Sequence, residues 1–149
     1  MSSFRISSCL NLLSLSLTLS LPNLTWAQTA NLPNGQTLIF NANSQKCMDD
    51  PYSSLNPGTK IQQFYCTDNL NQKWHFVKAN NGVMIRSPLA KLCLATNGGS
   101  KEPQAEIILA SCDSNNPNLV WSINANATQF SFTNKASNLC PVSYTHLRA

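Results

Sequence analysis

The chain has 149 residues, of which only 11% are charged, and a formal net charge of +4. Its length is that of a single domain. The basic residues are scattered, with no Lys/Arg run and no basic amphipathic helix, so the sequence argues against a nucleic-acid partner.

The first 27 residues have the features of a secretory signal peptide. Arg5 precedes an uncharged Leu/Ser-rich stretch at 6–21, and Ala27 ends a segment that fits a cleavage site. An uncleaved anchor is the alternative, but the apolar stretch is short for a bilayer span and is diluted by serine and Pro22. We therefore expect residues 1–27 to be removed and the mature chain to be secreted, without membrane insertion.

After a lead-in at 28–35, short segments rich in Ile, Val, Phe, Tyr and Thr alternate with polar turn clusters, and no stretch has a helical period. The predicted strands are Thr37–Asn41, Lys46–Asp49, Lys60–Cys66, Lys73–Val77, Val83–Arg86, Leu92–Ala95, Glu106–Ser111, Val120–Ile123, Phe130–Thr133 and Asn138–Val142. The turns between them are marked by clusters such as Asn80-Asn81-Gly82. The sequence predicts an all-β fold.

An internal repeat organises these strands. The intervals Cys47–Cys66 and Cys93–Cys112 have the same length, recur 46 residues apart, and are followed by Trp74 and Trp121. Repeats of this size share one core, because a single unit cannot bury its own apolar residues. The repeats span about 36–81, 82–128 and, in part, 129–142. We expect both tryptophans in the core, with each indole N–H hydrogen-bonded.

The cysteine spacing predicts disulfides within repeats. In an oxidising compartment, Cys47–Cys66 and Cys93–Cys112 would each close a loop of about 20 residues and contribute about 3 kcal/mol. Cys9 would leave with the signal peptide, so Cys140 would be single. Its partner would lie in another chain or in sequence beyond this one, and the repeat spacing favours the second.

The third repeat is unfinished, since a partner for Cys140 and a third tryptophan would lie beyond the last residue. We therefore expect a truncated sequence, which leaves room for an additional domain. Residues 143–149 break the repeat pattern and are interpreted as a non-native tail.

Particular motifs resemble the ricin B-type lectin domain. Lys46-Cys47-Met48-Asp49, the segment 58–66 and Asn71-Gln72-Lys73-Trp74 are similar to its first repeat, including the Gln-x-Trp signature. The second repeat keeps Leu92-Cys93-Leu94, but its signature is reduced to Asn118-Leu119-Val120-Trp121. The resemblance covers 36–142. It implies a β-trefoil of three four-stranded repeats, the third incomplete, stabilised by disulfides.

The resemblance also implies a carbohydrate pocket in the first repeat. Its residues would be Asp49, Gln62, Phe64 and Asn71, with Gln72 supporting them. A carboxylate accepts charge-assisted hydrogen bonds from sugar hydroxyls, an amide can donate and accept, and a ring packs against the C–H face of a pyranose. Strand alternation places Gln62 and Phe64 on one face.

The other repeats lack this set. The second repeat has Ala95, Ile108 and Ala110 at three of the positions and keeps only Asn118, and the third has Val142 at the aspartate position. We therefore expect one competent pocket in the sequence.

Two of the predicted site residues could have a structural role instead of contacting a sugar. Asp49 could cap the turn entered at Asp50, although Asp50 is the better turn residue. Phe64 could belong to the core, in which case Tyr65 would be the exposed ring.

The predicted function is a secreted lectin domain that binds galactose-type or related glycans or glycoproteins without a cofactor or metal. A hydrolase is disfavoured because the side chains of Asp49 and Asp50 diverge on a strand and cannot flank a glycosidic bond. His75 has no catalytic partners in the sequence. A non-lectin secreted trefoil, acting as a scaffold or protease inhibitor, and a binding module of a larger secreted hydrolase or toxin are the alternatives.

Overall fold

A computed structural model describes residues 2–8, 34–125 and 130–143 of the chain. In this part the regular structure is β-strand, apart from four short 3-10 turns. The strands are β1 (Ser2–Ser8), β2 (Thr37–Leu38), β3 (Cys47–Asp49), β4 (Gln62–Phe64), β5 (Lys73–Ala79), β6 (Gly82–Arg86), β7 (Cys93–Thr96), β8 (Ile107–Ala110), β9 (Trp121–Ala125), β10 (Phe130–Asn134) and β11 (Leu139–Ser143). The 3-10 turns are η1 (Pro51–Ser53), η2 (Leu70–Gln72), η3 (Asn97–Gly99) and η4 (Pro117–Leu119). Among the described residues, no helix has the length and apolar character needed to cross a bilayer.

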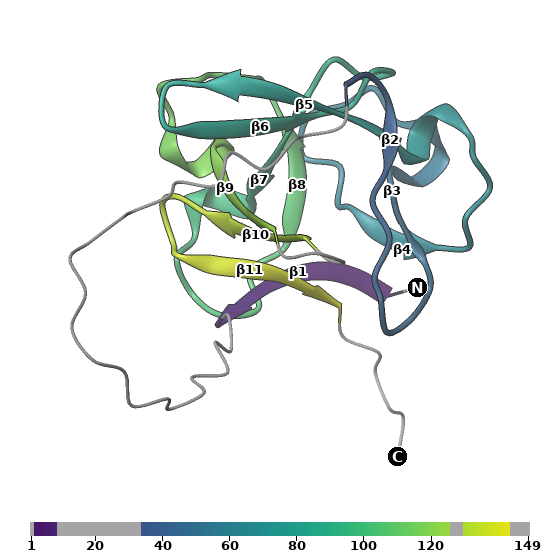
Figure 1. Ribbon diagram of the computed structural model, residues 1–149, viewed down its shortest axis with the longest axis horizontal. Coiled ribbons are helices and arrows are strands. Elements are labelled where there is room, and N and C mark those ends of the chain that lie inside the picture. The colour runs from purple at the N-terminus through teal and green to yellow at the C-terminus, as the bar shows by residue number, and fades with distance from the viewer. Residues whose placement is uncertain (1, 9–33, 126–129, 144–149) are drawn as a thin grey trace, which may run out of the picture.

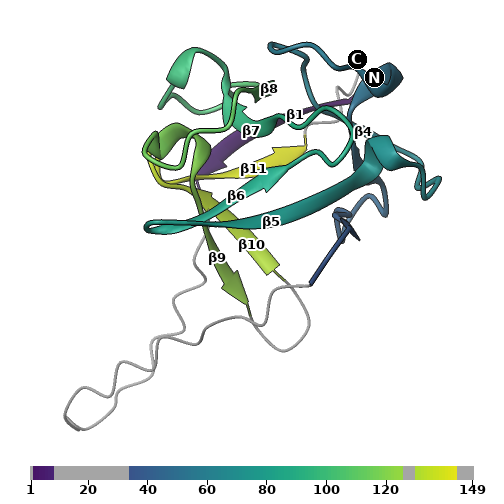
Figure 2. The same cartoon turned by 90° about the horizontal axis from the view of Figure 1, so that it is seen from above.

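The all-β prediction is confirmed, and each of the ten predicted strands overlaps an observed one. The first repeat contributes β2 to β5 and the second β6 to β9, so each has four strands. Within a repeat, the second and third strands form an antiparallel hairpin, β3 with β4 and β7 with β8. The fourth strand of each repeat pairs with the first strand of the next, β5 with β6 and β9 with β10. Figures 1 and 2 show how these hairpins curl around one centre.

The third repeat contributes β10 and β11, and β1 lies beside β11 in both views (Figures 1 and 2). The two strands are antiparallel from Phe4↔Ser143 to Ser8↔Leu139, and β1 also pairs with β4 through Ser2↔Gln63. Strand β1 therefore takes the place that β4 and β8 have in their own repeats. Strand β1 lies within residues 1–27, for which a signal peptide remains a prediction. Cleavage of that peptide would remove β1.

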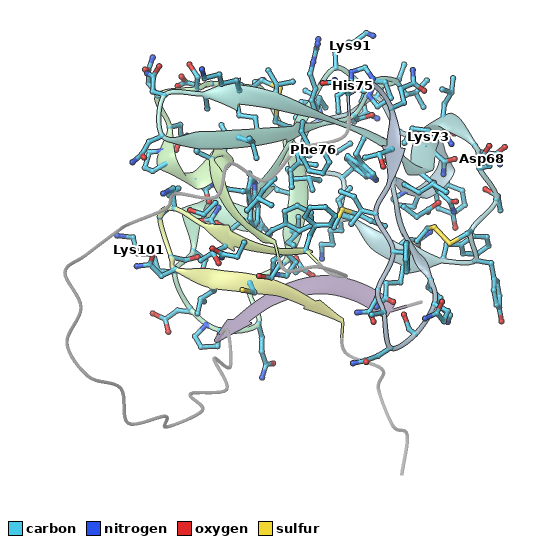
Figure 3. The ribbon with its side chains drawn as sticks, viewed as in Figure 1. Asp68, Lys73, His75, Phe76, Lys91 and Lys101 are labelled. Carbon is cyan, nitrogen blue, oxygen red and sulfur yellow. A yellow bond between two sulfur atoms is a disulfide. The ribbon has the colours of Figure 1, made fainter. Side chains whose placement is uncertain are left out.

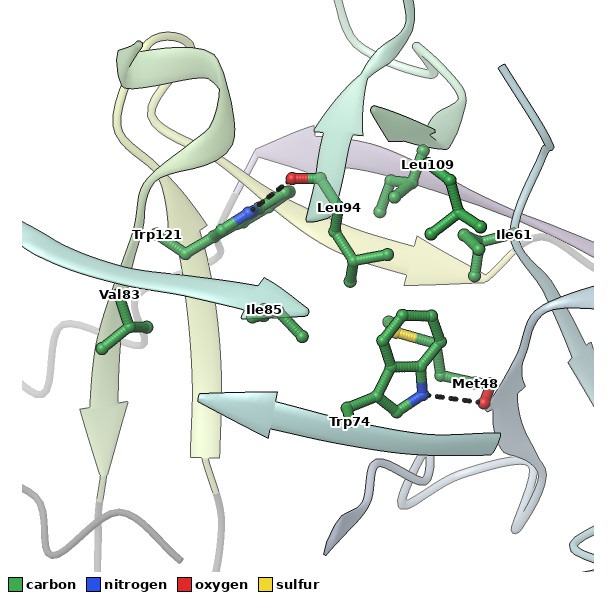
Figure 4. Close-up of a cluster of buried hydrophobic side chains, with 9 residues drawn as sticks. Met48, Ile61, Trp74, Val83, Ile85, Leu94, Leu109 and Trp121 are labelled. Atoms are coloured by element: carbon green, nitrogen blue, oxygen red, sulfur yellow. Dashed lines mark hydrogen bonds between the residues drawn. The ribbon is translucent and has the colours of Figure 1, made fainter. Parts of the chain in front are cut away.

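The core joins side chains from all three repeats. Trp74 and Trp121 are fully buried, and each indole N–H donates to a backbone carbonyl, from Trp74 to Met48 at 3.1 Å and from Trp121 to Leu94 at 3.2 Å (Figure 4). The two bonds are equivalent, because Met48 and Leu94 each follow the first cysteine of their repeat. Aliphatic residues fill the space between the indoles: Ile61, Val83, Ile85, Ile107 and Leu109.

Two disulfides close the loops that the repeat spacing predicts. Cys47–Cys66 and Cys93–Cys112 both have Cα atoms 5.1 Å apart. The expectation for Cys140 is wrong in one respect: it takes part in a disulfide in this chain, with a partner outside the described residues.

Gly82 links the first two repeats and has little space for a side chain. Its φ is +151°, and an added Cβ would lie 2.5 Å from the backbone oxygen of Trp121. We expect Gly82→Ala to lower the free energy of unfolding by about 2 kcal/mol, because backbone must shift to relieve the overlap. Gly58, at φ +85° with no atom near an added Cβ, is the matched control. Gly58→Ala measures the conformational cost alone, about 1 kcal/mol; equal urea midpoints for the two variants would contradict the steric argument.

Candidate functional site

The β3–β4 hairpin brings the predicted first-repeat residues to one face. Asp49 is directly opposite Gln62, and Cys47 is directly opposite Phe64. Because side chains alternate along a strand and directly opposed residues share a face, these four side chains point the same way. Met48 and Gln63 point to the other face, where both are buried. One face of the hairpin therefore contributes to the core, and the other presents a carboxylate, an amide and a ring.

Asp49 is the centre of a hydrogen-bond cluster. Its Oδ2 accepts from Nε2 of Gln62 at 2.7 Å, and its Oδ1 accepts from Nδ2 of Asn71 at 2.8 Å and from Nε2 of Gln72 at 3.0 Å. The residue is only 3% exposed. A carboxylate has about four acceptor positions, so three donors leave capacity at Oδ2. The cluster holds the carboxylate in one orientation.

Two of these three amides, those of Asn71 and Gln62, also have an oxygen that is not used as an acceptor within the described part of the chain. Among the described residues, neither Oδ1 of Asn71 nor Oε1 of Gln62 accepts a hydrogen bond, and both side chains are partly exposed. Side by side, these oxygens and the carboxylate can accept from neighbouring hydroxyl groups. The arrangement suits a ligand with several adjacent hydroxyls.

Gln72 lies beneath this cluster and has no exposed surface. Its amide nitrogen donates to Asp49 and to the Tyr65 carbonyl at 2.8 Å, and its Oε1 accepts from the Thr67 backbone at 2.8 Å. With its amide fully engaged, Gln72 positions Asp49 and does not itself reach the surface.

Phe64 and Tyr65 form the apolar part of the site. Phe64 is 43% exposed and Tyr65 71% exposed, and their rings meet edge to face with centroids 5.9 Å apart. The alternative that assigns Phe64 to the core is therefore wrong. Phe64 shares the face of Asp49 and is the ring that can lie against a ligand bound there.

Asp50 is buried, which the sequence did not indicate. Its backbone N–H donates to the Asn71 carbonyl at 2.9 Å, and its own carbonyl accepts from Nδ2 of Asn71 at 3.0 Å. Its side chain does not cap η1, and neither carboxylate oxygen has a hydrogen-bond partner among the described residues. Burial raises the pKa of Asp50 to about 6; the Ser54 backbone lowers this pKa and the nearby Asp49 charge raises it further.

The second repeat retains the framework and lacks the site. Asn118 donates from Nδ2 to the Thr96 carbonyl at 3.1 Å, as Asn71 does to the carbonyl of Asp50, and also accepts from the Thr96 hydroxyl. Ala95, at the position of Asp49, provides no acceptor, and Ala110, at the position of Phe64, provides no ring. The hydrogen bond from the asparagine amide to a backbone carbonyl occurs in both repeats and is therefore structural. Of these two repeats, in the residues that the structure describes, only the first has several amide donors that converge on a carboxylate.

Solved structures with the same arrangement are known. A designed threefold-symmetric protein, ThreeFoil, superimposes with a TM-score of 0.67 at 16% identity, over 78% of this chain and 93% of that one. An exo-β-1,3-galactanase from Clostridium thermocellum gives a TM-score of 0.63 at 21% identity, over 69% of this chain and 22% of the enzyme. The hemolytic lectin CEL-III gives 0.59 at 27% identity, over 70% of this chain and 23% of the lectin. No curated protein matches the chain.

The three hairpin-linked repeats and these neighbours define the molecule as a β-trefoil. The model of the ricin-type β-trefoil lectin domain matches residues 35–145, and the chain belongs to this family. The family's fold is a non-catalytic, carbohydrate-binding one, which in some proteins is attached to a glycosidase. The chain spans less than a quarter of the galactanase and of CEL-III.

Proposed function

We propose that the chain is a secreted lectin domain that binds galactose-type glycans through the first-repeat site. The observation that carries the proposal is the convergence of three amide donors on Asp49, beside the exposed ring of Phe64. The second repeat, with the same backbone and no carboxylate, serves as an internal comparison. Secretion is supported by the predicted signal peptide and by disulfides in the described part.

The chemistry of the site matches that of a pyranose. Vicinal hydroxyls can donate to Oδ2 of Asp49 through a charge-assisted bond and to the free amide oxygens of Asn71 and Gln62. The C–H face of the sugar can then pack on Phe64. One shallow site of this kind gives a dissociation constant in the millimolar range, about −4 kcal/mol, so useful avidity requires several copies.

Asp49→Asn tests the charge at the centre of the site. We expect about a tenfold loss of affinity for lactose, because neutral hydrogen bonds replace charge-assisted ones. Asparagine keeps the size of the side chain, and the partly exposed amide of Gln62 can rotate to pair with it. Asp49→Ala is the poorer probe, because it leaves half-buried or fully buried amide donors without an acceptor and so also lowers the stability of the fold.

The measurement is retention on immobilised lactose together with thermal unfolding. Phe64→Ala should also lose retention with an unchanged melting temperature, because the ring is exposed. Glu102→Ala, an exposed carboxylate of the second repeat, is the control and should be retained like the parent. If all three variants are retained equally, the first-repeat site is not where the sugar binds.

A second candidate is a carbohydrate-binding module of a longer protein. It is favoured by the galactanase and CEL-III, in which a domain like this one is a minor part of the chain. The continuous reading frame that contains these residues would distinguish the two. The alternative of a non-lectin trefoil rests on the second repeat alone, and a glycan array without any bound sugar would favour it.

A further inference from the structure

We infer that the ligand of the first-repeat site is an oligosaccharide, and that the exposed ring of Phe40 is a second sugar contact, on which a sugar beyond the one at Asp49 packs. The inference rests on the proposed function, because it extends the same site to a longer ligand.

Phe40 lies on the same face of the sheet as the site. It is directly opposite Cys47 in an antiparallel bridge, and Cys47 is directly opposite Phe64 on its other side. Directly opposed residues share a face, so these three side chains form a row across three strand paths, with Cys47 in the middle. The residues next to them point the other way: Met48 belongs to the core, and Ile39 packs against it. The row is therefore on the outer face, which also presents the carboxylate.

The two phenyl rings of this row flank Asp49. Asp49 is two residues beyond Cys47 on the central strand β3, so it is a diagonal neighbour of Phe64 on one side and of Phe40 on the other. Diagonal neighbours on one face are about 7–8 Å apart, which is within reach of an aromatic side chain. Phe40 is 61% exposed and Phe64 43% exposed, so both rings offer surface to a ligand. The carboxylate thus has an exposed ring on each side.

The separation of the two rings exceeds one sugar. The Phe40–Cys47 pair is of the close, non-hydrogen-bonded kind, because the backbone hydrogen bonds on either side of it join the residues before and after. The Cys47–Phe64 pair is then of the wider kind, and the two spacings, about 4.5 Å and about 5.5 Å between Cα atoms, place Phe40 about 10 Å from Phe64. The disulfide from Cys47 to Cys66 makes the middle of the row apolar. One pyranose cannot cover both rings, whereas a chain of two or three can.

The other repeats have no ring at this position. Arg86 is directly opposite the first cysteine of the second repeat, in the register that Phe40 has in the first. The repeat spacing puts Thr133 at the same position of the third repeat. The fold therefore accepts a charged or polar residue here, and it does not require a phenyl ring for packing. Phe40 occurs only in the repeat that has the carboxylate, which favours a role in the site.

A phenyl ring with a structural role is placed differently in this chain. Phe76 packs against the core, stacks on Phe132 with the ring centroids 5.8 Å apart, and lies among the interior side chains (Figure 3). Within the described residues, no stacked or edge-to-face contact is found for the ring of Phe40. That ring is available to a ligand.

The test compares β-galactosides of increasing length: methyl β-galactoside, lactose and 4′-galactosyllactose, which contain one, two and three sugars. We expect the parent to bind the trisaccharide about five to ten times more tightly than methyl β-galactoside, the effect of covering roughly 50 Å² of ring surface. NMR titration reports the contact directly. The trisaccharide should shift the ring signals of both Phe40 and Phe64, and methyl β-galactoside only those of Phe64.

Phe40→Ala should abolish the gain in affinity with length and have no effect on methyl β-galactoside, which does not reach residue 40; Phe40→Trp should retain the gain. Phe130→Ala is the matched control, because Phe130 is also an exposed phenylalanine, 53% exposed, and lies on β10 of the third repeat. Equal affinity of the parent for one sugar and for three, or an undiminished gain in Phe40→Ala, would overturn the inference while the proposed function stands. If the parent binds none of the three galactosides, the proposed function fails and the inference falls with it.

Discussion

Trp74→Ala is expected to lower the free energy of unfolding by about 3–5 kcal/mol, and the melting temperature by about 12–20 °C. The indole is fully buried between residues of the first two repeats, and its N–H is bonded to the Met48 carbonyl. Removing it leaves a large cavity and a buried acceptor without its donor. Small domains are stable by about 5–15 kcal/mol, so the loss removes a large part of the total. Urea titration followed by circular dichroism gives the value.

Two variants separate the contributions to this loss. Trp74→Phe keeps most of the apolar volume and removes the donor, so its cost should be about 1–3 kcal/mol. Trp121→Ala should cost about as much as Trp74→Ala, because Trp121 makes the same bond, to Leu94, from the equivalent place. A loss below 1 kcal/mol for either alanine variant would mean that the two tryptophans do not form a shared core.

Local patterns explain why so much of the fold could be predicted. The equal cysteine intervals define the repeat, and alternation along 62–64 places Gln62 and Phe64 on one face, as the register of β3 and β4 confirms. The burial of Trp74 and Trp121 and their hydrogen bonds follow from the size and the polar N–H of the indole. These features depend on residues that are near one another in the sequence.

Features that depend on distant contacts were not predicted. Strand β1 pairs with β11, more than 130 residues away, and no periodicity of a single segment can show such a pairing. Asp50 was interpreted as a turn residue from its type, whereas η1 and the Asn71 backbone enclose it. Gln72 was predicted to support the pocket residues, and its burial and its hydrogen bond to Asp49 show how it does so.

The burial of Asp50 predicts a chain that becomes less stable as the pH rises. Its pKa is about 6 in the folded protein, against 3.8 for an unperturbed group. Between these two values the folded chain holds a proton that the unfolded chain has lost, so the free energy of unfolding falls as the pH increases from 4 to 6. Above pH 6 both states are ionised, and the full difference, about 3 kcal/mol, opposes folding.

Asp50→Thr should remove this penalty, because the second repeat already contains the replacement. Thr96 occupies the equivalent buried position, and its hydroxyl donates to Oδ1 of Asn118. In the variant, the new hydroxyl can donate in the same way to Oδ1 of Asn71. We expect the variant to be more stable than the parent by up to about 3 kcal/mol at pH 7.5, and the two to converge near pH 4. Carboxyl groups that do not interact with residue 50 contribute equally to both proteins, so the difference between their urea titrations reports Asp50 together with its repulsion from Asp49. Parallel stability curves from pH 4 to 7.5 would show that Asp50 keeps an ordinary pKa, and that a partner or water satisfies its carboxylate in the folded chain.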